Sequence, residues 1–183
     1  MSDLDEVVIR PIQPADGPAL RRFHDGLSER TVYLRFFAVH PHLTDEEVDH
    51  FTVVDHASRE ALVVERGDDI VAVARFDQTS PDRAEVAFVV ADDCQGRGLG
   101  MRLLDELVPR ARARGIAALD ADVLTSNARM LGLFERCGWP MSEHHVDDVV
   151  RVTLDITSGT RSRDQAAAAR DVGADGQDGN AGR

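Results

Sequence analysis

In one stretch of the chain, a β-strand pattern runs through a short glycine-rich loop into an amphipathic helix pattern. Residues 84–91, AEVAFVVA, are rich in β-branched residues, and residues 95–100, QGRGLG, follow with glycine at every second position. Apolar residues then recur at helical spacing, at Leu99, Leu103, Leu104, Leu107, Val108 and Ala111. A strand that continues so directly into a helix constrains the chain to a fold in which a sheet and helices pack on each other.

The glycine-rich loop is suited to binding an anion. The first turn of a helix leaves backbone N–H groups without intrahelical partners, and the helix dipole favours negative charge there. Glycine leaves room for a phosphate to approach and permits positive φ, while Arg97 and Arg102 add positive charge. Because the dipole alone is worth only ~0.3–1 kcal/mol at an exposed site, the N–H groups must provide most of the binding. We therefore predict a phosphate cradle at residues 95–100.

The rest of the chain adds strands and helices in a regular order. Strands are expected at 6–12, 59–66, 69–76, 84–91, 116–124, 140–146 and 149–156, and helices at 14–27, 28–37, 44–54, 99–115 and 126–138. The three central strand patterns are joined by short turns and predict an antiparallel meander. We expect Asp16 to cap the first helix, and Thr44 to form a capping box with Glu47. In the run 33–37 the phenylalanines are expected in the core, unlike Tyr33 and Arg35.

The composition indicates one globular domain followed by a polar tail. We assign residues 1–156 to the domain and expect residues 157–183, which are small and polar, to be disordered. No apolar run is long enough for a membrane helix, and the acidic N-terminus is unlike a signal peptide. We therefore expect a cytoplasmic protein without a membrane partner. Cys94 and Cys137 lack metal-ligand spacing, and no disulfide is expected in that compartment.

The charged residues argue against several functions. The formal net charge of −12 disfavours a nucleic-acid partner and suits a cationic one. All 21 Lys and Arg residues are arginine, which excludes a Walker A loop and Schiff-base chemistry, because both need a lysine. The histidines lack the i, i+4 spacing of a zinc protease motif, so we expect no metal. A dinucleotide GxGxxG motif fails because Met101 stands in place of its last glycine.

Gln95-Gly96-Arg97-Gly98-Leu99-Gly100 resembles the (Q/R)xxGx(G/A) loop of the GNAT superfamily of N-acetyltransferases, and the expected order of elements is similar to that fold over residues 6–156. The resemblance implies a GNAT-like α/β (α+β) fold, with a mixed, mostly antiparallel central sheet of about six or seven strands flanked by helices. It also implies an enzyme that transfers the acetyl group of acetyl-CoA, its cosubstrate, to an amine.

The resemblance assigns roles to particular residues. It implies that the backbone amides of the loop hold the pyrophosphate of the cofactor, which makes the cofactor-binding residues Gln95, Gly96, Arg97, Gly98, Leu99 and Gly100. Phe88, Val89 and Val90 would pair with the pantetheine arm. Asn127 is similar to an asparagine that lies near the cofactor in the family.

Transfer to an amine requires a base that takes a proton from the ammonium group, and Glu85 is our catalytic candidate. Strand alternation places Glu85, Ala87 and Val89 on one face. The alternative interpretation of Glu85 is a solvated carboxylate at a strand edge. A strand N–H near Val89 or Val90 is expected to stabilise the developing negative charge, and the transfer is expected to be direct.

Three further residues bear on this mechanism. Many family members carry a tyrosine that protonates the leaving thiolate, and the matching position here is Phe134. Cys137 or water are the possible substitutes. Cys94 precedes the loop and could mimic a nucleophile, but no histidine stands in a partnering motif, so covalent catalysis is not expected.

The segment LSERTVYLRFF, with HPHLTDEEVDHF and the glycine-rich loop, resembles the acetyltransferase domain of Pat-type protein lysine acetyltransferases. This implies a protein lysine substrate, such as an acyl-CoA synthetase. One alternative is a small amine, for example a polyamine, an amino acid or an aminoglycoside. A second is a non-catalytic module that holds acyl-CoA as a sensor. No oligomeric state is assigned.

Overall fold

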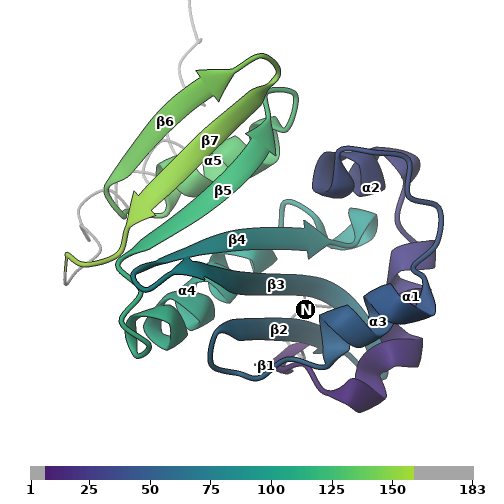
Figure 1. Cartoon of the computed structure of the whole chain (residues 1–183). Helices are drawn as coiled ribbons and strands as arrows, with labels where there is room; N and C mark the ends of the chain where they lie inside the picture. The colour runs from purple at the N-terminus through teal and green to yellow at the C-terminus, as the bar shows by residue number, and fades with distance from the viewer. Residues whose placement is uncertain (1–6, 159–183) are drawn as a thin grey trace, which may run out of the picture.

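A computed structural model describes residues 7–158 of the chain (Figure 1). Within them the elements follow the order expected from the sequence. The strands are β1 (Val7–Pro11), β2 (Arg59–Arg66), β3 (Asp69–Ser80), β4 (Arg83–Val90), β5 (Ala118–Leu124), β6 (Met141–Val146) and β7 (Val149–Asp155). The helices are α1 (Gly17–Asp25), α2 (Glu29–Phe36), α3 (Asp45–Thr52), α4 (Leu99–Arg112) and α5 (Ala128–Arg136), with short 3-10 turns η1 (Pro14–Asp16) and η2 (Asp92–Cys94).

In this described part of the chain, seven strands form one sheet in the order β1-β2-β3-β4-β5-β7-β6. Neighbouring strands are antiparallel except β4 and β5, which are parallel. The predicted mixed, mostly antiparallel sheet flanked by helices is therefore confirmed, and so is the β2–β3–β4 meander.

The sheet opens between β4 and β5. These strands pair only where Arg83–Glu85 lies beside Ala118–Asp120. Beyond that point β4 stays beside β3 as far as Val90, whereas β5 stays beside β7 as far as Leu124. Figure 1 shows the two strands diverging toward the side where α2 lies. The divergence leaves the main-chain groups on one edge of β4 facing away from β3, toward this opening.

Helices cover both faces of the sheet and bury two clusters of apolar side chains. α4 and α5 lie on one face, where Leu103, Leu107 and Phe134 belong to the larger cluster. α1 and α3 lie on the other face, where Phe23 and Val48 belong to the smaller one. The apolar positions predicted for α4 are all buried: Leu99, Leu103, Leu104, Leu107, Val108 and Ala111.

The predicted capping box of α3 is confirmed, because Thr44 Oγ1 accepts from the N–H of Glu47 at 3.2 Å and Glu47 Oε2 accepts from the N–H of Thr44 at 2.8 Å. Asp16 stands at the N-cap position of α1 as predicted, but its side chain makes no capping bond to that helix. The carboxylate instead accepts two hydrogen bonds from Arg10, at 2.7 and 2.8 Å, and one from the N–H of Gln13 at 2.7 Å. A bidentate, charge-assisted pair of this kind is stronger than a neutral capping bond.

The prediction that Phe37 lies in the core is also wrong. It ends α2 in the left-handed conformation, with φ 59°, and its side chain is 38% exposed. The turn that ends the helix points this ring outward, whereas Phe36 packs against the α1–α3 layer.

β7 ends at Asp155, and the next residue, Ile156, is buried in the larger cluster. The predicted disordered tail lies outside the described residues except for Thr157 and Ser158, so the division at 156 stays a prediction. No helix within residues 7–158 is long and apolar enough to cross a membrane.

Candidate active site

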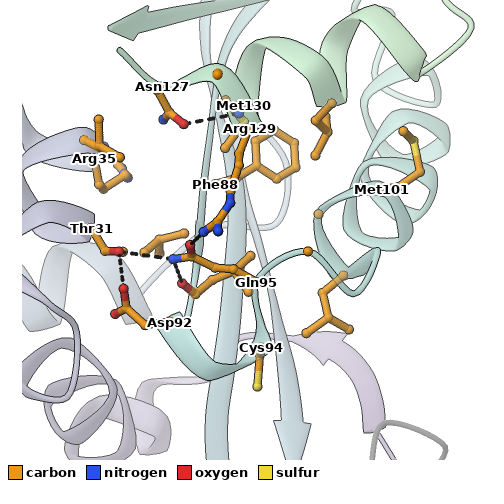
Figure 2. A pocket seen from close by; sticks show the side chains of 18 of the residues that line it. Thr31, Arg35, Phe88, Asp92, Cys94, Gln95, Met101, Asn127, Arg129 and Met130 are labelled. Carbon is orange, nitrogen blue, oxygen red and sulfur yellow. Dashed lines mark hydrogen bonds between the residues drawn. The ribbon is translucent and has the colours of Figure 1, made fainter. Parts of the chain in front are cut away.

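A cleft of about 680 Å³ lies where β4 and β5 diverge. Its walls are α2, the end of β4, the glycine-rich loop with the start of α4, and the start of α5 (Figure 2). Most of the predicted cofactor-binding residues line it: Phe88, Val89, Val90, Gln95, Gly96, Gly98, Leu99, Gly100 and Asn127. Arg97 is exposed and is not part of this lining, so its role stays a prediction.

Gly96 and Gly98 give the loop its shape. Their φ angles are 75° and 83°, a backbone conformation that residues with a side chain rarely adopt. A Cβ at either position would meet nothing within 4 Å. Gly98 is also the N-cap of α4, and no side chain caps the helix there. The first-turn N–H groups of α4 therefore lie at the cleft without a capping side chain, which is the arrangement expected of an anion site.

Gly100 lies where α4 faces α5, and its predicted role in cofactor binding stays a prediction. It has a helical backbone, and a Cβ built there would lie 2.5 Å from Leu133 Cδ1 of α5. Its lack of a side chain therefore lets α4 and α5 pack closely.

Gln95 joins three walls of the cleft through its side-chain amide. The amide nitrogen donates to Thr31 Oγ1 of α2 at 3.1 Å and to the carbonyl of Val90 at 3.0 Å. The amide oxygen accepts a hydrogen bond from Arg129 of α5. Figure 2 shows Arg129 reaching across the cleft to Gln95. A ligand lying along β4 at this point has to displace that contact.

Asp92 anchors the start of α2 to the end of β4. Its carboxylate accepts from the N–H of Ser28 at 2.8 Å, from Ser28 Oγ at 2.7 Å and from Thr31 Oγ1 at 2.7 Å. No local sequence pattern marks Thr31, Asp92 or Arg129 as site residues, because their contacts join distant parts of the chain.

The end of β4 presents main-chain groups to the cleft. The N–H of Ala91 donates to the carbonyl of Val71 in β3 at 2.8 Å. Successive residues of a strand direct their main-chain groups to opposite edges, so the N–H and carbonyl of Val90 point away from β3. The bond from Gln95 to the Val90 carbonyl agrees with this direction. Of the two N–H groups proposed from the sequence, that of Val90 rather than Val89 faces the open edge.

The side chains of β4 alternate between the two faces of the sheet as predicted. Phe88 is buried and its ring packs edge-to-face on Phe134, with ring centroids 6.1 Å apart. Glu85, Ala87 and Val89 lie on the opposite face, where α1 and α3 pack. Glu85 is exposed and does not line the cleft. It lies opposite Asp77 in the register of β3 and β4.

A second, smaller cavity of about 40 Å³ lies under the helices on the Glu85 face. Apolar side chains of α1 and α3 line it, together with Ala87 and Val89 of β4. Two arginines also line it, Arg35 of α2 and Arg75 of β3. Arg35 lines the larger cleft as well, so it stands where the two spaces meet.

Asn127 is the N-cap of α5, and its side chain accepts from the N–H of Met130 at 3.2 Å. Figure 2 shows this bond at the edge of the cleft. The predicted residue therefore lies at the cleft, where its carbonyl oxygen fixes the start of the helix.

Phe134 and Cys137 are both buried in the larger apolar cluster and neither lines the cleft, which does not favour Cys137 as an acid. Cys94 is buried beside the loop, and burial raises the pKa of its thiol. A thiol with a raised pKa forms little thiolate, which agrees with the expectation that it is not a nucleophile. Among residues 7–158, no three His, Cys, Asp or Glu side chains are placed to hold a metal ion.

A cleft between diverging strands that ends at an uncapped helix start is a site for an extended ligand with an anionic group. Residues 30–139 match the acetyltransferase (GNAT) family. The chain therefore belongs to this acetyltransferase family.

Two proteins named Pat are similar to the chain. "Acetyltransferase Pat" of Mycolicibacterium smegmatis is 34% identical over 134 residues, which are 71% of this chain and 40% of that protein. The chain thus spans less than half of this relative. The crystal structure of the GNAT domain of S. lividans PAT has a TM-score of 0.76 and 36% identity, and the match covers 80% of this chain and 89% of that one.

A third relative has a different name. An L-methionine sulfoximine/L-methionine sulfone acetyltransferase of Pseudomonas aeruginosa is 41% identical over 58 residues, which are 32% of this chain and 34% of that protein.

Proposed function

We propose that the chain binds acetyl-CoA and transfers its acetyl group directly to the side chain of a protein lysine, with Glu85 as the general base. The observation that carries the proposal is the loop of Gly96 and Gly98 at the start of α4, which opens into the cleft beside β4. The two relatives named Pat support a reaction of the Pat type.

The cleft fits the cofactor. The open glycines leave room for the pyrophosphate beside the N–H groups of residues 96–100, and the edge of β4 at Phe88–Val90 offers main-chain groups to the pantetheine arm. When bound, acetyl-CoA supplies the acetyl group as a reactive thioester.

Glu85 and Val90 have complementary roles in the proposal. The Glu85 carboxylate takes a proton from the acceptor ammonium group, which leaves a neutral amine able to react. The N–H of Val90 faces the open edge and stabilises the carbonyl oxygen of the thioester, which gains negative charge when the amine attacks. The buried thiol of Cys94 stays protonated, so the acetyl group goes directly to the amine.

Exposed apolar side chains near the cleft support a macromolecular acceptor. Tyr33 and Phe37, on and just after α2, are 45% and 38% exposed, and Val39 is 90% exposed. α2 forms one wall of the cleft, so a protein that presents its lysine there would cover these side chains.

A small amine is the second candidate acceptor. The relative that acetylates L-methionine sulfoximine and L-methionine sulfone supports it. This second candidate shares the cofactor and the base with the first.

The test measures CoA release with protein and small-amine acceptors, for the wild type, Glu85→Gln and Glu106→Gln. Glu106 is an exposed glutamate of α4 outside the site and serves as the control. We expect Glu85→Gln to lower kcat/KM by roughly 10²–10⁴-fold without weakening acetyl-CoA binding. An unchanged rate in Glu85→Gln would show that Glu85 is not the general base. Tight acetyl-CoA binding without transfer to any acceptor would instead favour the sensor module.

A further inference from the structure

Two arginines, Arg35 and Arg75, lie near Glu85, the proposed base. Arg75 of β3 lies opposite Ala87 in the strand register, next to the pair of Asp77 and Glu85 on the same face. Arg35 lines both the cleft and the smaller cavity. Figure 2 shows Arg35 on the α2 wall of the cleft, one helical turn beyond Thr31.

These arginines are not fully neutralised by the carboxylates around them. Asp77 is shared, because it pairs with Arg59 at 2.9 Å and with Arg75 at 3.2 Å. The charges acting on Arg35 come from Arg75, Glu85 and Asp77. Each of these two carboxylates also acts on another arginine, Asp77 on Arg59 and Glu85 on Arg151, so the charges of Arg35 and Arg75 are only partly offset.

The hydrogen-bond donors of the pair are also in excess. Arg75 is 6% exposed, and its Nη2 is buried without a hydrogen-bond partner in the described part of the chain. The guanidinium of Arg75 lies 4.8 Å from the ring centroid of Phe51, and that of Arg35 lies 5.0 Å from that of Phe36. Burial, and then the charge of Arg75, lower the pKa of Arg35 to about 10. A buried donor such as Arg75 Nη2 is normally paired. The two arginines therefore lack a hydrogen-bond acceptor that a ligand would provide.

We propose that Arg35 and Arg75 make the acceptor site selective for an amine that carries a carboxylate close to it. A guanidinium group binds a carboxylate through two parallel N–H···O bonds, and Arg35 is the first of the two that a ligand in the cleft meets. Arg75 lies behind it and adds its charge and its unused donor. A purely cationic amine meets like charge instead and is disfavoured.

This inference rests on the proposed function and narrows its acceptor. The carboxylate has two possible sources, a free amino acid or an acidic residue beside the target lysine of a protein. Both present the same chemistry to Arg35, and the experiment separates them.

The experiment compares kcat/KM for matched acceptors that differ only in the carboxylate. One arm uses L-leucine, L-leucinamide and isoamylamine, and the other uses lysine peptides flanked by glutamate or by glutamine. The enzymes are the wild type, Arg35→Gln, Arg35→Lys and Arg75→Gln, with Arg22→Gln as control. Arg22 is exposed on α1 and lines neither cavity.

In at least one arm, we expect the wild type and Arg22→Gln to prefer the carboxylate member by about 10-fold or more, mainly through KM. Arg35→Gln should bring that preference close to one, and Arg35→Lys should restore only part of it. A wild-type preference near one in both arms would overturn the inference. The inference would also be overturned if Arg35→Gln lowered kcat equally for all acceptors. Arg35 would then act by positioning Glu85 and not by binding a carboxylate.

A binding measurement separates this inference from the proposed function. Calorimetry with CoA present compares N-acetyl-L-leucine with N-acetyl-L-leucinamide, and the acetylated Glu- and Gln-flanked peptides with each other. Tighter binding of the carboxylate member in the wild type, lost in Arg35→Gln, supports the inference even if no acceptor is turned over. Equal binding within both pairs contradicts it, and thermal melting shows whether Arg75→Gln is folded.

Discussion

At the scale of single residues, His24 and Arg75 keep polar atoms inside the layer of α1, α2 and α3 without hydrogen-bond partners among the described residues. Each such atom costs about 1–3 kcal/mol compared with its hydrated state. Both residues line the smaller cavity next to the proposed acceptor site. This part of the cost to folding therefore lies beside the proposed acceptor site, and an unpaired buried polar group is a feature found at functional sites.

His24 makes the stability of the protein depend on pH. Burial, and then the charge of His40, lower its pKa below the ordinary 6.5, so the folded protein holds it neutral. Below pH 6.5 the unfolded chain takes up a proton that the folded chain does not, and each pKa unit of difference is worth about 1.4 kcal/mol. The contribution of His24 to the free energy of unfolding should therefore fall as the pH drops from 6.5 toward 5.

Urea unfolding of the wild type, His24→Leu and His144→Leu at pH 7 and pH 5 measures this effect. His144 is an exposed residue of β6 and serves as the control. His24→Leu should lose less stability on acidification than the other two proteins. Equal losses in all three would show that His24 is not the group responsible.

At the scale of elements, α2 forms a wall of the cleft and is held to β4 by Asp92. The three hydrogen bonds from Ser28 and Thr31 lie near the surface, so we expect Asp92→Ala to cost only about 1 kcal/mol of global stability. The larger effect should be local, with faster amide exchange in α2 and a KM for acetyl-CoA raised several-fold.

Amide hydrogen exchange with mass spectrometry tests this prediction against Asp68→Ala. Asp68 is exposed in the turn between β2 and β3, away from the cleft. If α2 exchanges as slowly in Asp92→Ala as in Asp68→Ala, the anchor is unimportant.

The elements themselves could be predicted from the sequence, because the apolar periodicity of each one is local. The opening between β4 and β5 could not, since it depends on which residues of two distant strands pair. The contacts of Gln95 could not be predicted either, because its partner Thr31 lies 64 positions away and its partner Arg129 lies 34 positions away. The glycine-rich loop was visible because its chemistry lies within six consecutive residues, 95–100. The position of Asp16 before α1 was predicted correctly, but its side chain does not cap the helix because a nearby arginine competes for the carboxylate.

At the scale of the whole molecule, the chain has a formal net charge of −12 but places two arginines, Arg35 and Arg75, at the proposed acceptor site. The net charge of the protein therefore attracts an acceptor by its overall positive charge, whereas the two arginines select an acceptor by its carboxylate. A lysine-rich protein should be steered by the acidic surface, whereas a zwitterionic amino acid carries no net charge.

Added salt should separate these two effects. Between low ionic strength and about 0.5 M salt, kcat/KM for a lysine-rich protein should fall several-fold, because the Debye length shrinks from about 30 Å to a few Å. The value for a free amino acid should change by less than about 2-fold. A protein acceptor whose kcat/KM does not respond to salt would contradict the steering.

The most direct test of the account is the affinity for acetyl-CoA of Gly98→Ala compared with Gly67→Ala. Both glycines have positive φ, 83° and 63°, with nothing within 4 Å of an added Cβ, so each change should cost a similar ~1–2 kcal/mol of stability. Only Gly98 lies at the cleft. We predict that calorimetry finds at least about 10-fold weaker binding for Gly98→Ala and wild-type binding for Gly67→Ala. Equal affinities in both folded variants, or no affinity in the wild type, would contradict the account.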